Sequence, residues 1–135
     1  MPLSRQELID ISIRYFEGCN IHNHKQVMST FTDDCVMSFS AADFRYTGIE
    51  SLSTHFEDFL GTFPIINFHD FIHIADEVSQ SICTYFTVIL EPEEGETLRM
   101  RNCNIFHLND QGLFKDCLIY NSGVLDQGFH AGNDK

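Results

Sequence analysis

The sequence predicts a single α+β domain in which helices come first and antiparallel strands follow. Apolar residues recur at helical spacing near the N-terminus, and they alternate with a period of two from about residue 65 onwards. Two short strands and a further helix are expected between these regions. Segregation of helices and strands along a chain is typical of α+β folds, with the helices gathered on one face of the sheet.

The first helix is expected from about residue 5 to residue 19. Ser4 and Glu7 have the spacing of a capping box, which begins a helix. Behind them, an apolar stripe follows at helical spacing: Leu8, Ile11, Tyr15 and Cys19. A second, short helix is expected over residues 24–31, with inward-facing Val27, Met28 and Phe31.

Two short strands and a third helix should come next. The segment Thr32–Asp34 is interpreted as a turn, and strands are expected at 35–40 and 44–47. Gly48 would then introduce a helix over 49–60, which Gly61 and Pro64 end. Its expected buried positions are Leu52, Phe56, Phe59 and Leu60.

The rest of the core should form four long strands. On the first, one face is expected to carry Ile66, Phe68, Ile72 and Ile74, and the other His69, Phe71 and His73. Later strands are expected at 98–108 and 113–121, joined by the turn sequence Asn109–Gly112. The chain is thus interpreted as one domain, residues 1–135, with a core of about 5–122 and a loose tail over 123–135.

Composition and charge limit the classes of partner. The net charge is −12, with 20 acidic and 8 basic residues, whereas phosphate binding requires clustered Lys and Arg. Nucleic acid and anionic membrane surfaces are therefore not expected as partners. The longest apolar run is shorter than the roughly 20 residues that span a bilayer. The five cysteines form no CxxC pair, which predicts buried free thiols, no zinc site and a reducing, cytoplasmic location.

Several segments together resemble a known family. The segments are Tyr15–Asn20, Phe31–Val36, Tyr46–Leu52, Asn104–Gly112 and Leu118–Tyr120. In their order and spacing, from about Leu8 to Ser122, they resemble the SnoaL-like domains of the nuclear transport factor 2-like superfamily. This resemblance implies a cystatin-like, cone-shaped curved sheet whose pocket is closed by three helices. Members include ketosteroid isomerases, polyketide cyclases, scytalone dehydratase, limonene epoxide hydrolase and non-catalytic binders, so the fold alone does not select a function.

The resemblance assigns two candidate polar groups to the pocket. Tyr15 matches the helix position at which ketosteroid isomerases carry an oxyanion-hole tyrosine, and such a phenol stabilises developing charge on a substrate oxygen. Asn104 matches the strand position of their protonated aspartate, and its amide can donate there without a raised pKa. The alternatives are a core tyrosine bonded to the backbone and an asparagine bonded locally.

The catalytic base is where this chain departs from the isomerases. An ungapped alignment places Phe39 at the position of their aspartate, and phenylalanine cannot accept a proton. Asp43 would replace it only if the turn before residue 44 folds inward. His69 and His73 are the other candidates because imidazole titrates near neutral pH, although either would equally serve as an exposed or satisfied strand residue. At the usual strand rise they would lie about 13 Å apart, too far to bind one metal alone.

The remaining expected pocket residues are apolar or amides. They are Phe39, Phe56, Asn102, Phe106, Ile119 and Asn121. Amides do not act as general bases, which argues against epoxide hydrolysis. His22, His24 and His55 are interpreted as structural or solvent-facing. No metal or cofactor is expected.

Two functions remain open at this point. The first is binding of a small apolar, carbonyl- or phenol-bearing molecule, with isomerase- or cyclase-type proton transfer by His69, His73 or Asp43. The second is a non-catalytic binding or protein-interaction module. A homodimer through the sheet is also expected, because family members pair through the face that would carry Arg99, Arg101, Cys103, Ile105 and His107.

Overall fold

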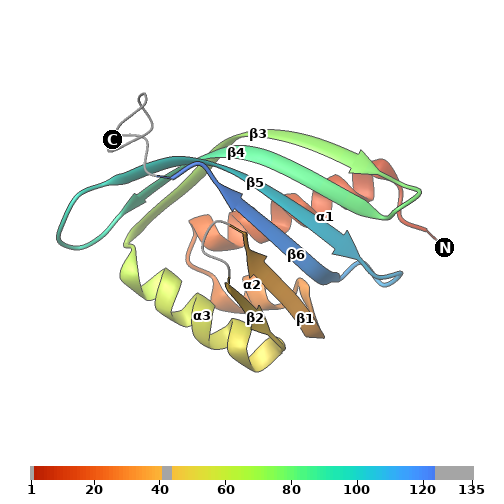
Figure 1. The fold of residues 1–135 in the computed structure, drawn as a ribbon, viewed down its shortest axis with the longest axis horizontal. Helices are drawn as coiled ribbons and strands as arrows, with labels where there is room; N and C mark the ends of the chain where they lie inside the picture. The colour runs from red at the N-terminus through yellow and green to blue at the C-terminus, as the bar shows by residue number, and fades with distance from the viewer. Residues whose placement is uncertain (1, 41–43, 124–135) are drawn as a thin grey trace.

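A computed structural model describes residues 2–40 and 44–123, and it confirms the α+β class (Figure 1). The elements in order are α1 (Arg5–Asn20), α2 (His24–Met28), β1 (Phe31–Phe39), β2 (Phe44–Thr47), α3 (Ile49–Thr62), β3 (Ile65–Asp76), β4 (Ser81–Glu91), β5 (Leu98–Leu108) and β6 (Phe114–Asn121). The strands form one curved sheet in the order β2-β1-β6-β5-β4-β3. Neighbouring strands are antiparallel except β1 and β6, which are parallel.

The helices pack on the concave side of the sheet (Figure 1). The predicted capping box begins α1: the Ser4 hydroxyl accepts a bond from the Glu7 backbone N–H at 3.1 Å, and the Glu7 carboxylate accepts one from the Ser4 N–H at 2.8 Å. Helix α1 packs against β3 and β4, and α3 packs against β1, β2 and α2. The two helices therefore cover different parts of the same concave surface.

The second helix is shorter than predicted, and the first strand is longer. Helix α2 ends at Met28, where Thr30 turns back to bond the carbonyl of Val27 through both its N–H and its hydroxyl. Phe31 already belongs to β1, so the predicted turn at Thr32–Asp34 is wrong. Between Phe31 and Val36 the pairing with β6 shifts register, and this irregular stretch of strand replaces the turn.

Strand β3 contains a bulge that reverses half of its predicted faces. From His69 to Ile72 the strand advances three residues while β4 advances two, and Asp70 adopts a positive φ of 57°. Ile66 and Phe68 are buried as predicted, but Ile72 and Ile74 are 55% and 64% exposed. The extra residue thus moves both isoleucines to the outer face.

Two smaller predictions are also corrected. Helix α3 continues through Gly61 to Thr62. All five cysteines are free, but Cys83 and Cys103 are only half-buried and lie with their sulfur atoms 3.1 Å apart. None of the helices in the described ranges is long and apolar enough to cross a membrane.

Candidate functional site

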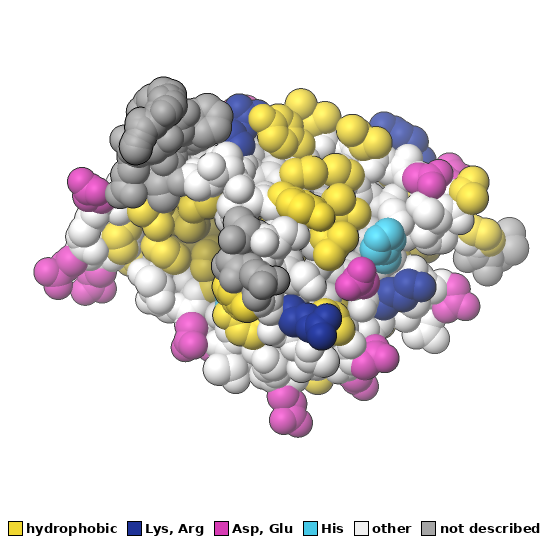
Figure 2. Space-filling model, viewed as in Figure 1, with side chains coloured by type: hydrophobic (Ala, Val, Ile, Leu, Met, Phe, Trp, Pro, Cys, Tyr) yellow, Lys and Arg dark blue, Asp and Glu magenta, His cyan; other side chains and the backbone are white. Residues whose placement is uncertain are grey.

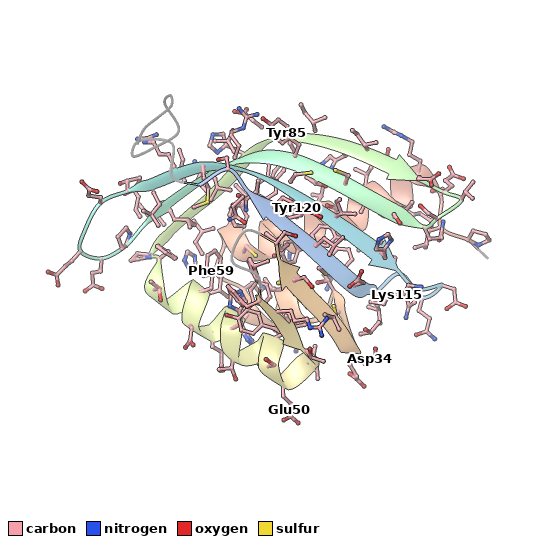
Figure 3. The ribbon with its side chains drawn as sticks, in the orientation of Figure 1. Asp34, Glu50, Phe59, Tyr85, Lys115 and Tyr120 are labelled. Carbon is pink, nitrogen blue, oxygen red and sulfur yellow. The ribbon has the colours of Figure 1, made fainter. Side chains whose placement is uncertain are left out.

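A cavity of about 110 Å³ lies between the concave face of the sheet and the helices α1 and α3. Most of its lining is apolar, and Figure 3 shows one of these side chains, Phe59, between α3 and the sheet. Five polar side chains of the described residues also line it: Tyr15, His55, Asn102, Asn104 and Asn121. An apolar pocket with a few polar groups is typical of a site for a small organic molecule.

The structure brings most of the predicted pocket residues together. Tyr15 of α1 and Phe56 of α3 face Asn102, Asn104, Asn121, Ile119 and Phe39 from three strands across this one cavity. Phe106 does not line it. That ring is fully buried and stacks on Phe114 at a centroid distance of 4.1 Å. It also contacts Tyr15 at 5.4 Å, so it packs against a lining residue on the side away from the cavity.

Tyr15 is held in an aromatic cage and is 5% exposed. Its ring makes edge contacts with five phenylalanines: Phe16, Phe31, Phe56, Phe106 and Phe114. Burial raises the pKa of Tyr15 well above its usual value, and the adjoining Cys19 thiol, to which it is hydrogen-bonded, raises it further. The phenol therefore stays protonated. Because a thiol is a weak partner, the hydroxyl can serve a ligand oxygen instead.

Two of the three asparagines carry buried oxygen atoms without partners. Asn102 and Asn104 are 9% and 3% exposed, and neither Oδ1 atom has a hydrogen-bond partner in the described part of the chain. The third, Asn121, pairs with Asn102 across β5 and β6, and its amide nitrogen lies 3.4 Å from the sulfur of Met100. An unpaired buried polar group costs about 1–3 kcal/mol, so these acceptor oxygens weaken the fold unless a hydrogen-bond donor in the cavity, such as the O–H of a phenol, bonds to them.

His69 and His73 do not line the cavity. His69 is on the outer face, where its Nε2 lies 3.7 Å from a carboxylate oxygen of the exposed Asp70. His73 is on the inner face because of the bulge, and its Nδ1 is 2.9 Å from the hydroxyl of Thr84, which in turn is 3.0 Å from that of Ser12. Partial burial lowers the pKa of His73, and Arg5 lowers it further. The expectation that the two histidines share a face is wrong, and Asp43 lies outside the described residues.

His55 is the cavity residue that the sequence analysis missed. It lies on α3 and lines both the cavity and a surface cleft, so its interpretation as structural or solvent-facing overlooked the cavity. Partial burial lowers the pKa of His55, while the nearby Asp58 carboxylate acts in the opposite direction. The available signal was its spacing, three residues after Leu52 and four before Phe59, which puts it at the edge of the apolar stripe of the helix.

A family model decides the classification. The SnoaL-like domain model matches residues 13–116, which is most of the chain. This protein belongs to the SnoaL-like family. The resemblance seen in the sequence is therefore confirmed.

Solved SnoaL-like and related structures show the same fold. BvnE pinacolase from Penicillium brevicompactum aligns with a TM-score of 0.76 and 18% identity, covering 87% of this chain and 86% of that one. AusH from Aspergillus nidulans aligns with a TM-score of 0.78 and 15% identity, and the alignment covers 98% of this chain and 100% of AusH. A proposed polyketide cyclase from Xanthomonas campestris pv. campestris aligns with a TM-score of 0.76 and 14% identity, and the alignment covers 86% of this chain and 90% of the cyclase. At these identities the likeness concerns the fold, and no curated protein matches the chain.

The chemistry available in this SnoaL-like cavity is that of neutral groups. A protonated phenol and three amides can donate hydrogen bonds, and an imidazole with a lowered pKa can accept a proton. The lining residues that the structure describes include no carboxylate, and Phe39 lines the cavity from the first strand. Among the described residues, no group of three or more His, Cys, Asp or Glu is placed to hold a metal ion.

Proposed function

We propose that this SnoaL-like domain binds a small apolar molecule of one or two rings that carries a carbonyl or phenol oxygen, and transfers a proton on it as isomerases and cyclases do. The cavity carries this proposal, because Tyr15 and Asn104 both line it and most of its other lining is apolar. Its volume of about 110 Å³ is near that of an engineered protein cavity of about 150 Å³ that binds benzene. Four fused rings would exceed that space.

The polar groups fix the expected orientation of the ligand. A carbonyl oxygen placed toward Tyr15 and Asn104 would accept hydrogen bonds from the phenol and from an amide N–H₂. These bonds strengthen as the oxygen gains negative charge, which lowers the barrier to removal of a proton from the neighbouring carbon. Fixed neutral donors in an apolar site are well suited to this task because they do not need to reorganise.

Thermal unfolding with a set of compounds tests the binding. The set is cyclohexanone, 2-indanone, 2-tetralone, 4-ethylphenol and 2-naphthol. A compound at about 100 times its Kd stabilises the protein by about 2.7 kcal/mol, which is about 10 °C for a domain of this size. We expect at least one such shift, and expect Tyr15→Phe to reduce it.

The matched control is Tyr120→Phe, since Tyr120 is 44% exposed on the outer face (Figure 3). Equal shifts in both variants would remove Tyr15 from the binding site. If no compound raises the Tm, the proposed function is contradicted.

A second candidate function is non-catalytic binding. It is favoured by Phe39, which lines the cavity and which the ungapped alignment assigns to the position of the isomerase base, because phenylalanine cannot take up a proton. A ketone that binds without any exchange of its α-protons would support this candidate over the first.

We also propose that two copies of the chain pair through the outer face of the sheet. Figure 2 shows hydrophobic side chains gathered over this face, and Ile72, Ile74, Tyr85 and Tyr120 are all more than one-third exposed. The Arg101 guanidinium covers the Tyr85 ring at 4.4 Å. Sedimentation of Ile74→Glu should show a monomer where the wild type is a dimer.

The five free cysteines support a reducing, cytoplasmic location.

A further inference from the structure

The imidazole of His55 lies in the wall between the cavity and the solvent. Its side chain lines the 110 Å³ cavity on one side and an open cleft of about 490 Å³ on the other, as Phe59 also does. Tyr46, Ser51, Thr54, Asp58 and Thr62 form the rest of the cleft. We infer that His55 removes a proton from a ketone bound in the cavity and exchanges it with water in the cleft. The inference rests on the proposed function, since it requires a ligand in the cavity.

Neighbouring rings fix the plane of the His55 side chain. The Tyr46 and Phe59 rings lie nearly parallel to the imidazole, with centroid distances of 4.4 and 6.2 Å. Phe39 and Phe56 contact it edge-on at 5.7 and 4.9 Å. The Phe56 ring also contacts Tyr15, at 6.0 Å, so His55 and Tyr15 lie around one ring in the cavity wall. A ligand of one or two rings can therefore reach both groups.

Within residues 2–40 and 44–123, neither ring nitrogen of His55 has a hydrogen-bond partner, in contrast to the other histidines described there. Among the histidines of the described ranges, only His55 has no hydrogen bond on either ring nitrogen. The others bond as follows: His22 to the Phe63 carbonyl, His24 to the Ser53 carbonyl, His69 to the Asn67 carbonyl, His73 to Thr84 and His107 to Ser81. The nitrogen atoms of His55 are thus available to a ligand and to water.

The charges around His55 favour a neutral base at pH 7. Asp58, from its own helix, is the carboxylate that acts on it, while β1 and β2 present the uncharged Phe39 and Tyr46. Partial burial is the larger effect and lowers the pKa of His55 below the usual value of 6.5. The base form is therefore the main form at neutral pH, and acidification removes it.

The proton-transfer step balances without a cofactor. The carbonyl oxygen bonds to Tyr15 and Asn104, and the α C–H bond breaks so that its proton moves to a nitrogen of His55. The electron pair of that bond forms the C=C bond of the enolate, and the negative charge falls on the oxygen that the donors hold. The imidazolium then gives a proton to water in the cleft, or returns one to a ligand carbon. Neither the asparagine amides nor the Tyr15 phenol, whose pKa is raised, can replace the neutral imidazole of His55 as the base.

Exchange of α-protons in D₂O measures this step directly. The probes are cyclohexanone, 2-indanone and 2-tetralone, and ¹H NMR follows deuteration of each with wild type, His55→Gln and the matched control His107→Gln. We expect protein-dependent exchange with at least one ketone and a loss of about 100-fold or more in His55→Gln. Binding of that ketone should change by less than about threefold. His107→Gln should keep the wild-type rate, since His107 lies outside the cavity lining.

The pH profile separates a base from a structural residue. The exchange rate should rise through a pKa below 6.5 and become constant near neutral pH. Asp58→Asn removes the carboxylate that raises the pKa of His55, so its profile should move to lower pH. A merely structural role for His55 would leave the profile in place.

The outcomes distinguish this inference from the proposed function. If a ketone binds and no exchange occurs, or if His55→Gln exchanges at the wild-type rate, His55 is not the base and the binding function stands. If His55→Gln fails to fold, the position of the Asp58→Asn profile decides: a shift supports the inference and an unmoved profile overturns it. If no ketone binds, the proposed function fails, and the inference fails with it.

Discussion

Substitution of Asn104 measures how much an unpaired polar group beside the cavity lowers the free energy of unfolding. The side chain is 3% exposed and its Oδ1 has no hydrogen-bond partner among the described residues. Leucine has the same number of non-hydrogen atoms in the same branching, and the adjacent cavity leaves room for its larger methyl groups. Asn104→Leu therefore removes a buried polar group and creates no new space.

The expected effect of Asn104→Leu is a more stable protein that no longer binds its ligand. Relief of an unpaired buried group is worth about 1–3 kcal/mol, and one kcal/mol corresponds to about 4 °C in Tm for a domain of this size. We therefore expect the Tm to rise by about 4–12 °C. In urea unfolding the midpoint should rise with an unchanged m-value, because the surface exposed on unfolding is nearly the same. The stabilisation by ketones or phenols seen in wild type should be lost.

Asn121→Leu is the matched control for this change. Asn121 is half-buried and its amide nitrogen already contacts the Met100 sulfur, so we expect less than about 1 kcal/mol of stabilisation. A decrease in the Tm of Asn104→Leu would show that the Asn104 amide is fully satisfied in the folded protein. The Asn104 amide would then have no unmet hydrogen bond to offer a ligand, which refutes its proposed role in binding.

Two further predictions test the packing and the bulge. Phe106→Ala should lower the free energy of unfolding by about 3–5 kcal/mol in urea titrations, because its fully buried ring stacks on Phe114; a loss below about 1 kcal/mol would contradict the supporting role given to this ring. Asp70→Val should destabilise by about 1–2 kcal/mol because a β-branched residue does not tolerate the positive φ, whereas Asp70→Gly should be nearly neutral. Equal stability of these two variants in thermal unfolding would argue against the bulge.

The order of the elements could be predicted because each depends on local patterns. The Ser4–Glu7 capping box and the alternation along β5 are short-range signals, and the structure confirms them. The bulge in β3 has no such signal. Aspartate tolerates the left-handed region better than most residues, but nothing in the sequence around Asp70 requires it to adopt that conformation. One extra residue then exchanged the faces of Ile72 and His73.

The end of α2 was missed because burial alone does not distinguish a helix from a strand. Phe31 lies at helical spacing from Val27, which suggested one continuous helix. In the structure Phe31 is buried by other contacts, since its ring stacks on Phe56 and meets Phe114 edge-on. Both partners are distant in sequence, and the pairing of Phe31 with Phe114 in the parallel β1–β6 ladder is a long-range contact that no local pattern predicts.

The candidate site was predictable where the strand pattern or the family resemblance indicated a residue, as for Asn102 and Tyr15, and it was not predictable at the edge of a helix face. Alternation along β5 placed Asn102 and Asn104 on the inner face, and the structure puts both in the cavity. For His55 the helical spacing indicates only a place at the edge of an apolar helix face. Whether that edge meets solvent or a cavity depends on how α3 sits against β1 and β2, which only the three-dimensional structure shows.

The neutrality of the cavity makes pH a diagnostic variable for the whole proposal. The Tyr15 phenol and the Asn102, Asn104 and Asn121 amides keep their charge state across the physiological range. Binding of a neutral ketone through these groups should therefore not vary with pH between about 6 and 8. His55 is the lining residue that titrates near this range, because partial burial lowers its pKa from 6.5. A turnover that depends on pH, together with binding that does not, is the behaviour expected of a site in which separate residues hold the ligand and move the proton.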